Sequence, residues 1–241
     1  MDVLDCIKTR RSIRKFLQKP IEFDIIARIL EAGHFAPSPG NLQNWKFIVV
    51  TDKELIKAAY GYCFRQECVY NASSLIVLCS LTEKVEGFYG KKGIKWGTQA
   101  VAAAAQNMLL AAHSLGLGAA WIGAFDEAEV RQIFEIPDSA SPEAIIALGY
   151  ADEKPLAERG ELHAVVRFND FGTHTNDTGS LFGEYAKQLQ EKIDKAADAG
   201  GKSVEDGAKK TRRVMHKLKE KLKNIKKIKG KDKEHQKEKA G

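Results

Sequence analysis

The 241-residue sequence has no hydrophobic run long enough to cross a membrane. A spanning helix needs about 18 consecutive apolar residues. The longest apolar stretches here, residues 100–105 and 108–112, are both followed by polar residues. The first residues are acidic and lack the basic segment that opens a signal peptide. These absences predict a cytoplasmic protein.

Cysteine is also scarce, with four residues in the whole chain: Cys6, Cys63, Cys68 and Cys79. Four are too few for a disulfide scaffold in a chain of this length, and their spacing matches no zinc motif. Six histidines are scattered along the sequence without a pattern typical of metal ligands. We therefore expect reduced, mostly buried thiols and no metal site.

Several catalytic and nucleotide-binding motifs are missing. The sequence contains no Walker A motif, no G-x-S-x-G and no H-E-x-x-H. Residues 116–120 begin like a dinucleotide-binding fingerprint. That motif must follow a strand and open a helix, whereas here a predicted helix precedes it and a predicted strand follows. A Rossmann domain is therefore not expected.

The composition indicates one sizeable folded core followed by a basic extension. Hydrophobic residues make up 44% of the chain, which is enough for such a core. Residues 1–180 carry 19 Lys and Arg against 22 Asp and Glu, whereas residues 181–241 carry 19 against 10, and no aromatic residue follows Tyr185. We predict a folded domain over residues 1–180, a basic helical extension over 181–229 and a disordered tail over 230–241.

Periodicity and turn-forming residues predict the elements of the folded domain. The predicted helices cover residues 3–8, 23–35, 53–60, 98–115 and 126–134. The predicted strands cover residues 46–51, 74–81, 119–123, 144–149 and 162–168. The strand over residues 74–81 is apolar enough to be buried on both faces. Further helices are expected over residues 180–197 and 203–228.

A cluster of cations is the first feature that suggests chemistry. Arg10-Arg11-Ser12-Ile13-Arg14 places three guanidinium groups and a hydroxyl near the end of a predicted helix. Guanidinium groups bind phosphate through paired hydrogen bonds, and a hydroxyl adds another. Taken alone, the run is also compatible with a solvated surface segment.

A turn-rich loop is the second such feature. Residues 36–41 are dense in turn formers and lead through Asn41, Gln43 and Trp45 into a predicted strand. Amide side chains both donate and accept hydrogen bonds, which suits the edge of a flat heterocycle. An ordinary helix-to-strand loop would have a similar composition.

Together these features resemble the FMN-dependent nitroreductase family. The signature R-R-S-I-R-x-F covers residues 10–16, and A-P-S-x-x-N-x-Q-x-W-x-F covers residues 36–47. An alanine-rich helix ending L-G-L-G-x-x-W-x-G at Gly123 and a late strand ending in G-Y at residues 149–150 complete the pattern. The resemblance spans residues 3–171. It departs at Asn44 and Ala151, where proline is common in the family.

The resemblance implies an α+β fold with three α/β/α layers, in which helices flank a mostly antiparallel sheet, and a C-terminal helical extension. It implies a homodimer with FMN at the interface and NADH or NADPH as the hydride donor. The acceptor would be a nitroaromatic, a quinone or a similar flat molecule, reduced by a ping-pong mechanism. Residues 83–96 would help to build the acceptor pocket.

The resemblance also implies a set of FMN-binding residues and no catalytic acid or base. Arg10, Ser12 and Arg14, with the backbone of Arg11, would hold the phosphate and ribityl end, and Arg14 would reach the N1/C2 edge. A fixed cation at that edge favours the reduced flavin, which carries negative charge near N1. The remaining contacts implied are Pro37, Ser38 and Asn41 of the partner subunit, the Gln66 amide, the backbone near N5 at Gly123 and Ala124, and Arg159.

Two alternative functions stay open at this point. One is a specialised redox enzyme of the same fold, such as one that fragments flavin, removes halogen or dehydrogenates a ring. The other is a flavin-binding or membrane-tethered module without turnover, in which the basic extension would be the functional part.

The extension itself has three interpretations. Apolar residues recur with heptad spacing from Val204 to Ile225, interrupted by Gly207, and lysine and arginine dominate the other faces. The stripe could dock on the folded domain or pair across a dimer. It could lie on an anionic membrane surface. It could also be partly disordered and contact a polyanion such as nucleic acid.

Overall fold

The computed structural model describes residues 1–156, 159–160, 165–167 and 171. The chain divides into two compact units, residues 1–158 and 159–241, and the elements below belong to the first. Most of the strand predicted over residues 162–168 lies outside the described residues. So do the helices predicted over residues 180–197 and 203–228 and the predicted tail.

The first unit contains a five-stranded sheet in which all strand pairs are antiparallel. The main path runs β1-β5-β3-β2, and β4 also pairs with β5. The long strand β5 pairs through its last two residues with β1 and through Ile145–Gly149 with β4. The strands are β1 (Phe16–Leu17), β2 (Trp45–Val50), β3 (Ser74–Ser80), β4 (Gly118–Ile122) and β5 (Ser141–Ala151).

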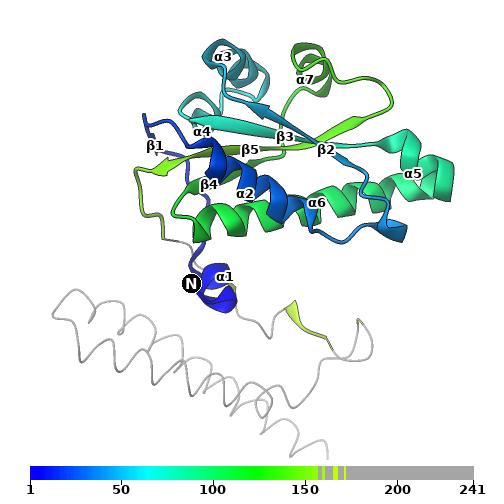
Figure 1. Ribbon diagram of the computed structural model, residues 1–241, viewed down its shortest axis with the longest axis horizontal. Coiled ribbons are helices and arrows are strands. Elements are labelled where there is room, and N and C mark those ends of the chain that lie inside the picture. The colour runs from blue at the N-terminus through cyan, green and yellow to red at the C-terminus, as the bar shows by residue number, and fades with distance from the viewer. Residues whose placement is uncertain (157–158, 161–164, 168–170, 172–241) are drawn as a thin grey trace, which may run out of the picture. The chain divides into compact units, whose positions relative to one another are not determined.

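Helices cover both faces of this sheet (Figure 1). The helices on one face are α3 (Lys53–Tyr62), α4 (Glu67–Tyr70) and α7 (Glu127–Ile133). On the other face lie α2 (Phe23–His34) and the 24-residue α6 (Lys91–Ser114), with α5 (Thr82–Tyr89) leading into α6. A helix at the N-terminus, α1 (Val3–Thr9), and a short 3-10 helix, η1 (Pro39–Asn41), complete the unit. The predicted three-layer α+β fold is confirmed.

The central strand β3 explains why the sheet is covered on both sides. All seven of its residues are buried. Leu75 and Val77 pack into one hydrophobic core, whereas Ile76 and Leu78 pack into the other. Side chains alternate between the two faces of a strand, so an uninterrupted apolar run supplies both cores. Each such side chain stabilises the fold by about 1.5–3 kcal/mol.

Helix α6 begins seven residues earlier than the pattern predicted, at Lys91. The added segment contains Gly93 and Gly97, which lower helix propensity by about 1 kcal/mol each. Close packing compensates for the lower helix propensity. A Cβ at Gly97 would lie 2.9 Å from Oγ of Ser80 and 3.0 Å from Nδ2 of Asn44, so only glycine fits there without a shift of these neighbours. Gly97 therefore lets α6 approach the sheet, and Gly93 lets it approach Tyr89 and Val85 of α5. These are tertiary contacts that local periodicity does not record.

The cysteines and the hydrophobic length of the helices bear on two further expectations. All four cysteines are buried and unbridged, as predicted. Within the described ranges, no helix is both long and apolar enough to cross a membrane.

Candidate active site

The arginine run leaves the end of α1 and follows the outer edge of β4. The Ile13 N–H donates to the carbonyl of Ala119 at 3.0 Å, and Ser12 forms a parallel bridge with the same residue. Gly118 makes this approach possible because a Cβ there would lie 2.9 Å from Cβ of Ile13. The backbone of the run is thus held by the sheet, while the Arg14 side chain is exposed.

One nitrogen of the Arg11 guanidinium is hydrogen-bonded within the protein itself. Its Nη1 donates to the carbonyls of Lys8 at 2.6 Å and Arg10 at 2.8 Å, at the C-terminal end of α1. A cation at this end of a helix satisfies unpaired carbonyls. Nη1 is thus committed to the end of α1, and the contact with FMN that the resemblance implies for Arg11 is through its backbone.

The backbone at Arg14 is fixed by a residue that sequence reasoning missed. Glu153 accepts hydrogen bonds at Oε1 from the N–H groups of Arg14 and Lys15. The Lys15 carbonyl in turn accepts from the N–H of Asp152 at 2.9 Å. Glu153 lies 139 residues from Arg14 in the sequence, and an isolated glutamate after a strand gives no local sign of this role.

Gln66 joins the start of α4 to the loop after β4. Its Nε2 donates to the carbonyls of Cys63 at 3.0 Å and Ala124 at 2.9 Å. Both acceptors are carbonyls, so the amide nitrogen must face them and Oε1 remains an acceptor for a ligand N–H. A second link, from the N–H of Asp126 to the carbonyl of Tyr62 at 2.8 Å, holds the same two segments. The predicted residues Gln66, Gly123 and Ala124 are therefore brought together.

The charge of Arg14 acts on a thiol of the segment that carries Gln66. Burial raises the pKa of the Cys68 thiol, and the charge of Arg14 opposes that shift. Cys68 lies in α4, two residues after Gln66. The buried Cys63 thiol has its pKa raised to about 12, chiefly by burial, so it is neutral near pH 7 and unsuited to act as a nucleophile.

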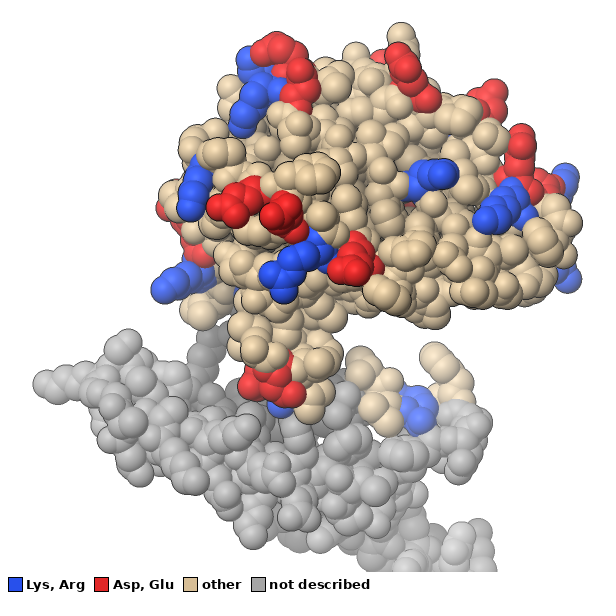
Figure 2. Space-filling view, viewed as in Figure 1, with Lys and Arg blue, Asp and Glu red and all other residues tan. Residues whose placement is uncertain are grey.

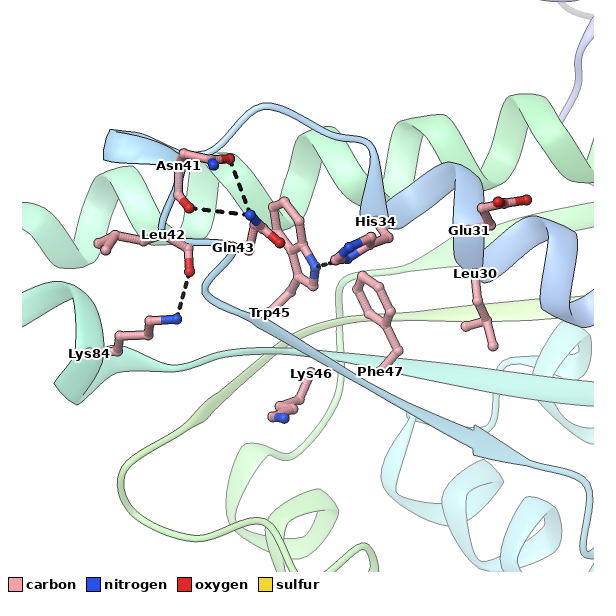
Figure 3. Close-up of a pocket in the computed structure, with 10 residues that line it drawn as sticks. All are labelled: Leu30, Glu31, His34, Asn41, Leu42, Gln43, Trp45, Lys46, Phe47 and Lys84. Carbon is pink, nitrogen blue, oxygen red and sulfur yellow. Dashed lines mark hydrogen bonds between the residues drawn. The ribbon is translucent and has the colours of Figure 1, made fainter.

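The second predicted cluster is a preorganised loop. Oγ of Ser38 accepts from the N–H of Gln43 at 2.9 Å, and the Ser38 carbonyl accepts from the N–H of Asn41 at 3.1 Å. The Gln43 amide donates to Oδ1 of Asn41 at 3.2 Å (Figure 3). Gly40, Asn41 and Gln43 have φ values of 56°, 56° and 48°. Pro37 and Asn41 are exposed.

An open pocket lies beside this loop (Figure 3). The rings of Trp45 and Phe47 project from β2 and stack with centroids 6.2 Å apart. Nε1 of Trp45 donates to Nδ1 of His34 at 3.4 Å, and Nζ of Lys84 donates to the carbonyl of Leu42 at 2.6 Å. The remaining lining residues are Leu30, Glu31, Asn41, Gln43 and Lys46.

The two clusters lie at opposite ends of α6. Thr9, next to the arginine run, contacts His113 in the last turn of α6, with Oγ1 and Nε2 2.9 Å apart. Gly40 lies directly against the hydroxyl of Tyr89, just before α6 begins. A helix of 24 residues is about 36 Å long. One mononucleotide cannot span that distance, so a single chain does not bring Asn41 to the arginine run.

A model of the nitroreductase family matches residues 7–67 and 57–150, the part of the chain that carries both clusters. The chain belongs to the nitroreductase family. The fold and the oxidoreductase class expected from the sequence are thereby confirmed.

Individual members of the nitroreductase family agree with this assignment. The chain is 40% identical over 161 residues to a Methanothermobacter thermautotrophicus protein provisionally named NADH dehydrogenase/NAD(P)H nitroreductase, with 64% of this chain and 80% of the relative covered. It is 36% identical over 179 residues to an Archaeoglobus fulgidus protein of the same provisional name, with 72% and 97% covered.

A solved structure shares the fold. The NADPH:FMN oxidoreductase of Vibrio harveyi, complexed with NAD+, matches with a TM-score of 0.66 at 27% identity. The match covers 83% of this chain and 92% of that one. Arg159, the last predicted site residue, is exposed and belongs to the second unit of this nitroreductase-family chain.

Proposed function

We propose that this protein is a homodimeric, FMN-dependent oxidoreductase that takes hydride from NADH or NADPH and reduces a flat acceptor by a ping-pong mechanism. Nitroaromatics and quinones are the acceptor class. When bound, FMN supplies the redox chemistry by accepting hydride and passing the electrons on. The names of the relatives, which mention NAD(P)H, FMN and nitroreductase activity, support this proposal.

The donor set of the first cluster suits FMN. Arg10 and Ser12 would bind the phosphate and ribityl end together with the backbone N–H of Arg11. Arg14 would lie at the N1/C2 edge, where a fixed cation stabilises the negative charge of the reduced ring. Oε1 of Gln66 would accept from the ring N–H, the one hydrogen-bond donor on that edge.

The observation that carries the proposal of a dimer is the separation of the two clusters along α6. A second copy would present Pro37, Ser38 and Asn41 to the arginine run of the first. The backbone at Gly123 and Ala124 would then lie near N5, and Arg159 would complete the phosphate contacts. Each dimer would hold two such sites.

Helix α1 supports the same assembly. Its apolar residues Val3, Leu4 and Ile7 are 68%, 61% and 49% exposed, although a helix of an isolated domain normally turns such residues inward. Cys6 is its only buried residue. A second copy would cover this apolar face, as happens at obligate dimer interfaces.

We assign acceptor binding to the aromatic side chains of residues 83–96, which are Phe88, Tyr89 and Trp96. Phe88 and Trp96 are 70% and 43% exposed, and the ring of Tyr89 lies between them at centroid distances of 6.4 Å and 5.3 Å. Figure 2 shows a wide area without charged side chains over the loop before β2 and the adjoining part of α6. Such surfaces favour flat, uncharged molecules over ionic ones.

Initial-rate kinetics test the proposed reaction. With NADH or NADPH and a quinone varied together, a ping-pong mechanism gives parallel double-reciprocal plots. Phe88→Ala is expected to raise the KM for the quinone several-fold, because it removes part of the exposed aromatic surface assigned to the acceptor. Lys57→Ala, at an exposed position of α3 outside residues 83–96, serves as the control. Intersecting plots or the absence of nicotinamide oxidation would contradict the proposal.

A further inference from the structure

A second pocket lies away from the predicted flavin residues, where β2 ends and β3 begins. The segment between β1 and α2 forms one wall, and the turn from β2 into α3 forms another. None of the side chains implicated in flavin binding lines it. The lining residues are Gln18, Lys19, Pro20, Ile21, Ile26, Thr51, Lys53, Ser73 and Ser74.

The two charged side chains of this pocket, Lys19 and Lys53, are both cations. Among the described residues, no carboxylate lies within ion-pair distance of either ammonium. Nζ of Lys19 lies 4.3 Å from the ring centroid of Tyr150, a contact that positions the ammonium without neutralising it. The pocket therefore presents two ammonium groups that form no ion pair with a described carboxylate.

The acidic residues that flank Lys53 in the sequence make their contacts with other groups. Oδ1 of Asp52 accepts from the N–H groups of Glu54 at 2.8 Å and Leu55 at 3.0 Å, where it caps α3. The Glu54 carboxylate pairs with Lys57 at 2.7 Å. Neither carboxylate forms an ion pair with Lys53.

Hydroxyl groups and apolar side chains complete the pocket. Ser74 is 1% exposed, and its hydroxyl makes only a marginal contact of 3.5 Å with the Leu75 carbonyl, so its proton is available to a ligand. Oγ of Ser73 donates to the Lys19 carbonyl at 2.7 Å and fixes the wall. Pro20, Ile21 and Ile26 supply apolar surface.

The size of the pocket limits its ligand. Its volume is about 340 Å³, at the lower end of the range of roughly 300–1,000 Å³ typical of small-molecule sites. A dinucleotide is too large for this space, whereas a short organic acid fits.

We propose that this pocket binds a small organic acid. Lys19 and Lys53 hold its carboxylate, Ser74 donates a hydrogen bond to it, and its apolar body packs on Ile21 and Ile26. Two ammonium groups beside apolar walls suit a carboxylate with a hydrocarbon chain better than inorganic phosphate, which offers nothing to the apolar surface. This site is independent of the proposed flavin chemistry.

Ligand-observed NMR titration of the full-length protein with 3-methylbutanoate tests the proposal. Saturable binding is expected, and Lys19→Gln and Lys53→Gln should each weaken it about tenfold, the effect of losing one charge-assisted hydrogen bond. Lys53→Arg should retain binding because it keeps the charge. Arg28→Gln removes the same charge from an exposed residue of α2 outside the pocket and should change nothing.

Three results would overturn the proposal. They are the absence of saturable binding, equal affinity in the wild type and in both glutamine variants, and saturation by inorganic phosphate but not by 3-methylbutanoate. Thermal unfolding of each variant checks that it is folded. Flavin content measured on the same samples keeps the outcome separate from that of the proposed reductase function.

Discussion

Arg14 combines an exposed guanidinium with a backbone that Glu153 holds in place. Such a side chain is poised to meet a ligand without a large loss of chain entropy, because the backbone is already ordered. A guanidinium at the flavin edge would both retain FMN and stabilise its reduced form. Removing this guanidinium should therefore affect both the binding of FMN and its reduction, and the two effects can be measured separately.

We expect Arg14→Ala to weaken FMN binding by about 10- to 100-fold, since a hydrogen bond to a charged group contributes roughly 1.5–3 kcal/mol. Flavin reduction by NAD(P)H should also slow. Fluorescence titration with FMN and stopped-flow reduction provide the two measurements, with Lys15→Ala as the neighbouring control. Unchanged values for both would remove Arg14 from the flavin site.

His113 is the second residue whose chemistry can be tested alone. Burial lowers its pKa from the ordinary 6.5, and the charges of Arg10 and Arg11 lower it further. The folded protein therefore resists protonating His113, whereas the unfolded chain protonates it as the pH falls below 6.5. His113 therefore lowers the free energy of unfolding as the pH falls below 6.5.

His113→Gln should remove that part of the pH dependence. We expect the difference in stability between wild type and variant to shift in favour of the variant from pH 7.5 to pH 5.5. Chemical unfolding at both pH values measures it, and the comparison cancels the effect of the many carboxylates that both proteins share. If the stability of the wild type and of the variant depends on pH in the same way, neither burial nor the arginines lower the pKa of His113 in the folded protein.

At the scale of elements, the contact of β1 with β5 depends on a glycine. A Cβ at Gly149 would lie 2.7 Å from Cβ, Cγ and Cδ1 of Phe16, and these atoms are too close to the backbone to move freely. Gly149 of β5 pairs with Gly118 of the neighbouring strand β4. The two glycines leave room for Ile13 and Phe16, the residues on either side of Arg14 and Lys15.

Gly149→Ala should destabilise the fold by about 1–3 kcal/mol, the usual cost of overpacking, and should also loosen FMN. Gly61→Ala is the matched control because nothing lies within 4 Å of that position in α3. It should stabilise the fold by roughly 0.5–1 kcal/mol. Urea unfolding measures both, and equal effects of the two substitutions would contradict the packing argument.

Elements with a strong local pattern could be predicted, and those defined by distant contacts could not. The apolar run of β3 and the capped helix after Asp126 follow from neighbouring residues. The two-residue strand β1 exists only because β5 lies beside it, so no local pattern records it. Strand β5 starts at Ser141 and includes Pro142, a residue that argues against a strand when read alone.

The candidate site divides in the same way. The roles proposed for Arg10, Ser12 and Asn41 follow from motifs in the sequence. The Gln66 link to Ala124 and the Glu153 support of Arg14 could not, because they join segments 58 and 139 residues apart. Contacts between such segments depend on the folded sheet and leave no periodic signal.

At the scale of the whole molecule, the proposed site needs two chains. A variant with Arg10→Ala and Ser12→Ala and a variant with Ser38→Ala and Asn41→Ala would each lack one half of every site as homodimers. A heterodimer of the two has one site with both defects and one site that is intact.

Mixing these two variants, followed by unfolding and refolding together, should therefore restore FMN binding. Random pairing gives about half heterodimers, so about a quarter of all sites should recover. Flavin absorbance per protein after gel filtration measures the recovery, with each variant refolded alone as the control. No recovery from folded, mixed dimers would place the whole site within one chain.

The most direct test of the central claim is the visible absorption spectrum of the purified full-length protein before and after anaerobic addition of NADH or NADPH. A bound-flavin spectrum that bleaches with one or both donors is predicted, and the more effective donor identifies the physiological preference. A protein that takes up no flavin when FMN is added, or whose bound flavin is reduced by neither nicotinamide, would contradict the assignment as an FMN-dependent NAD(P)H oxidoreductase.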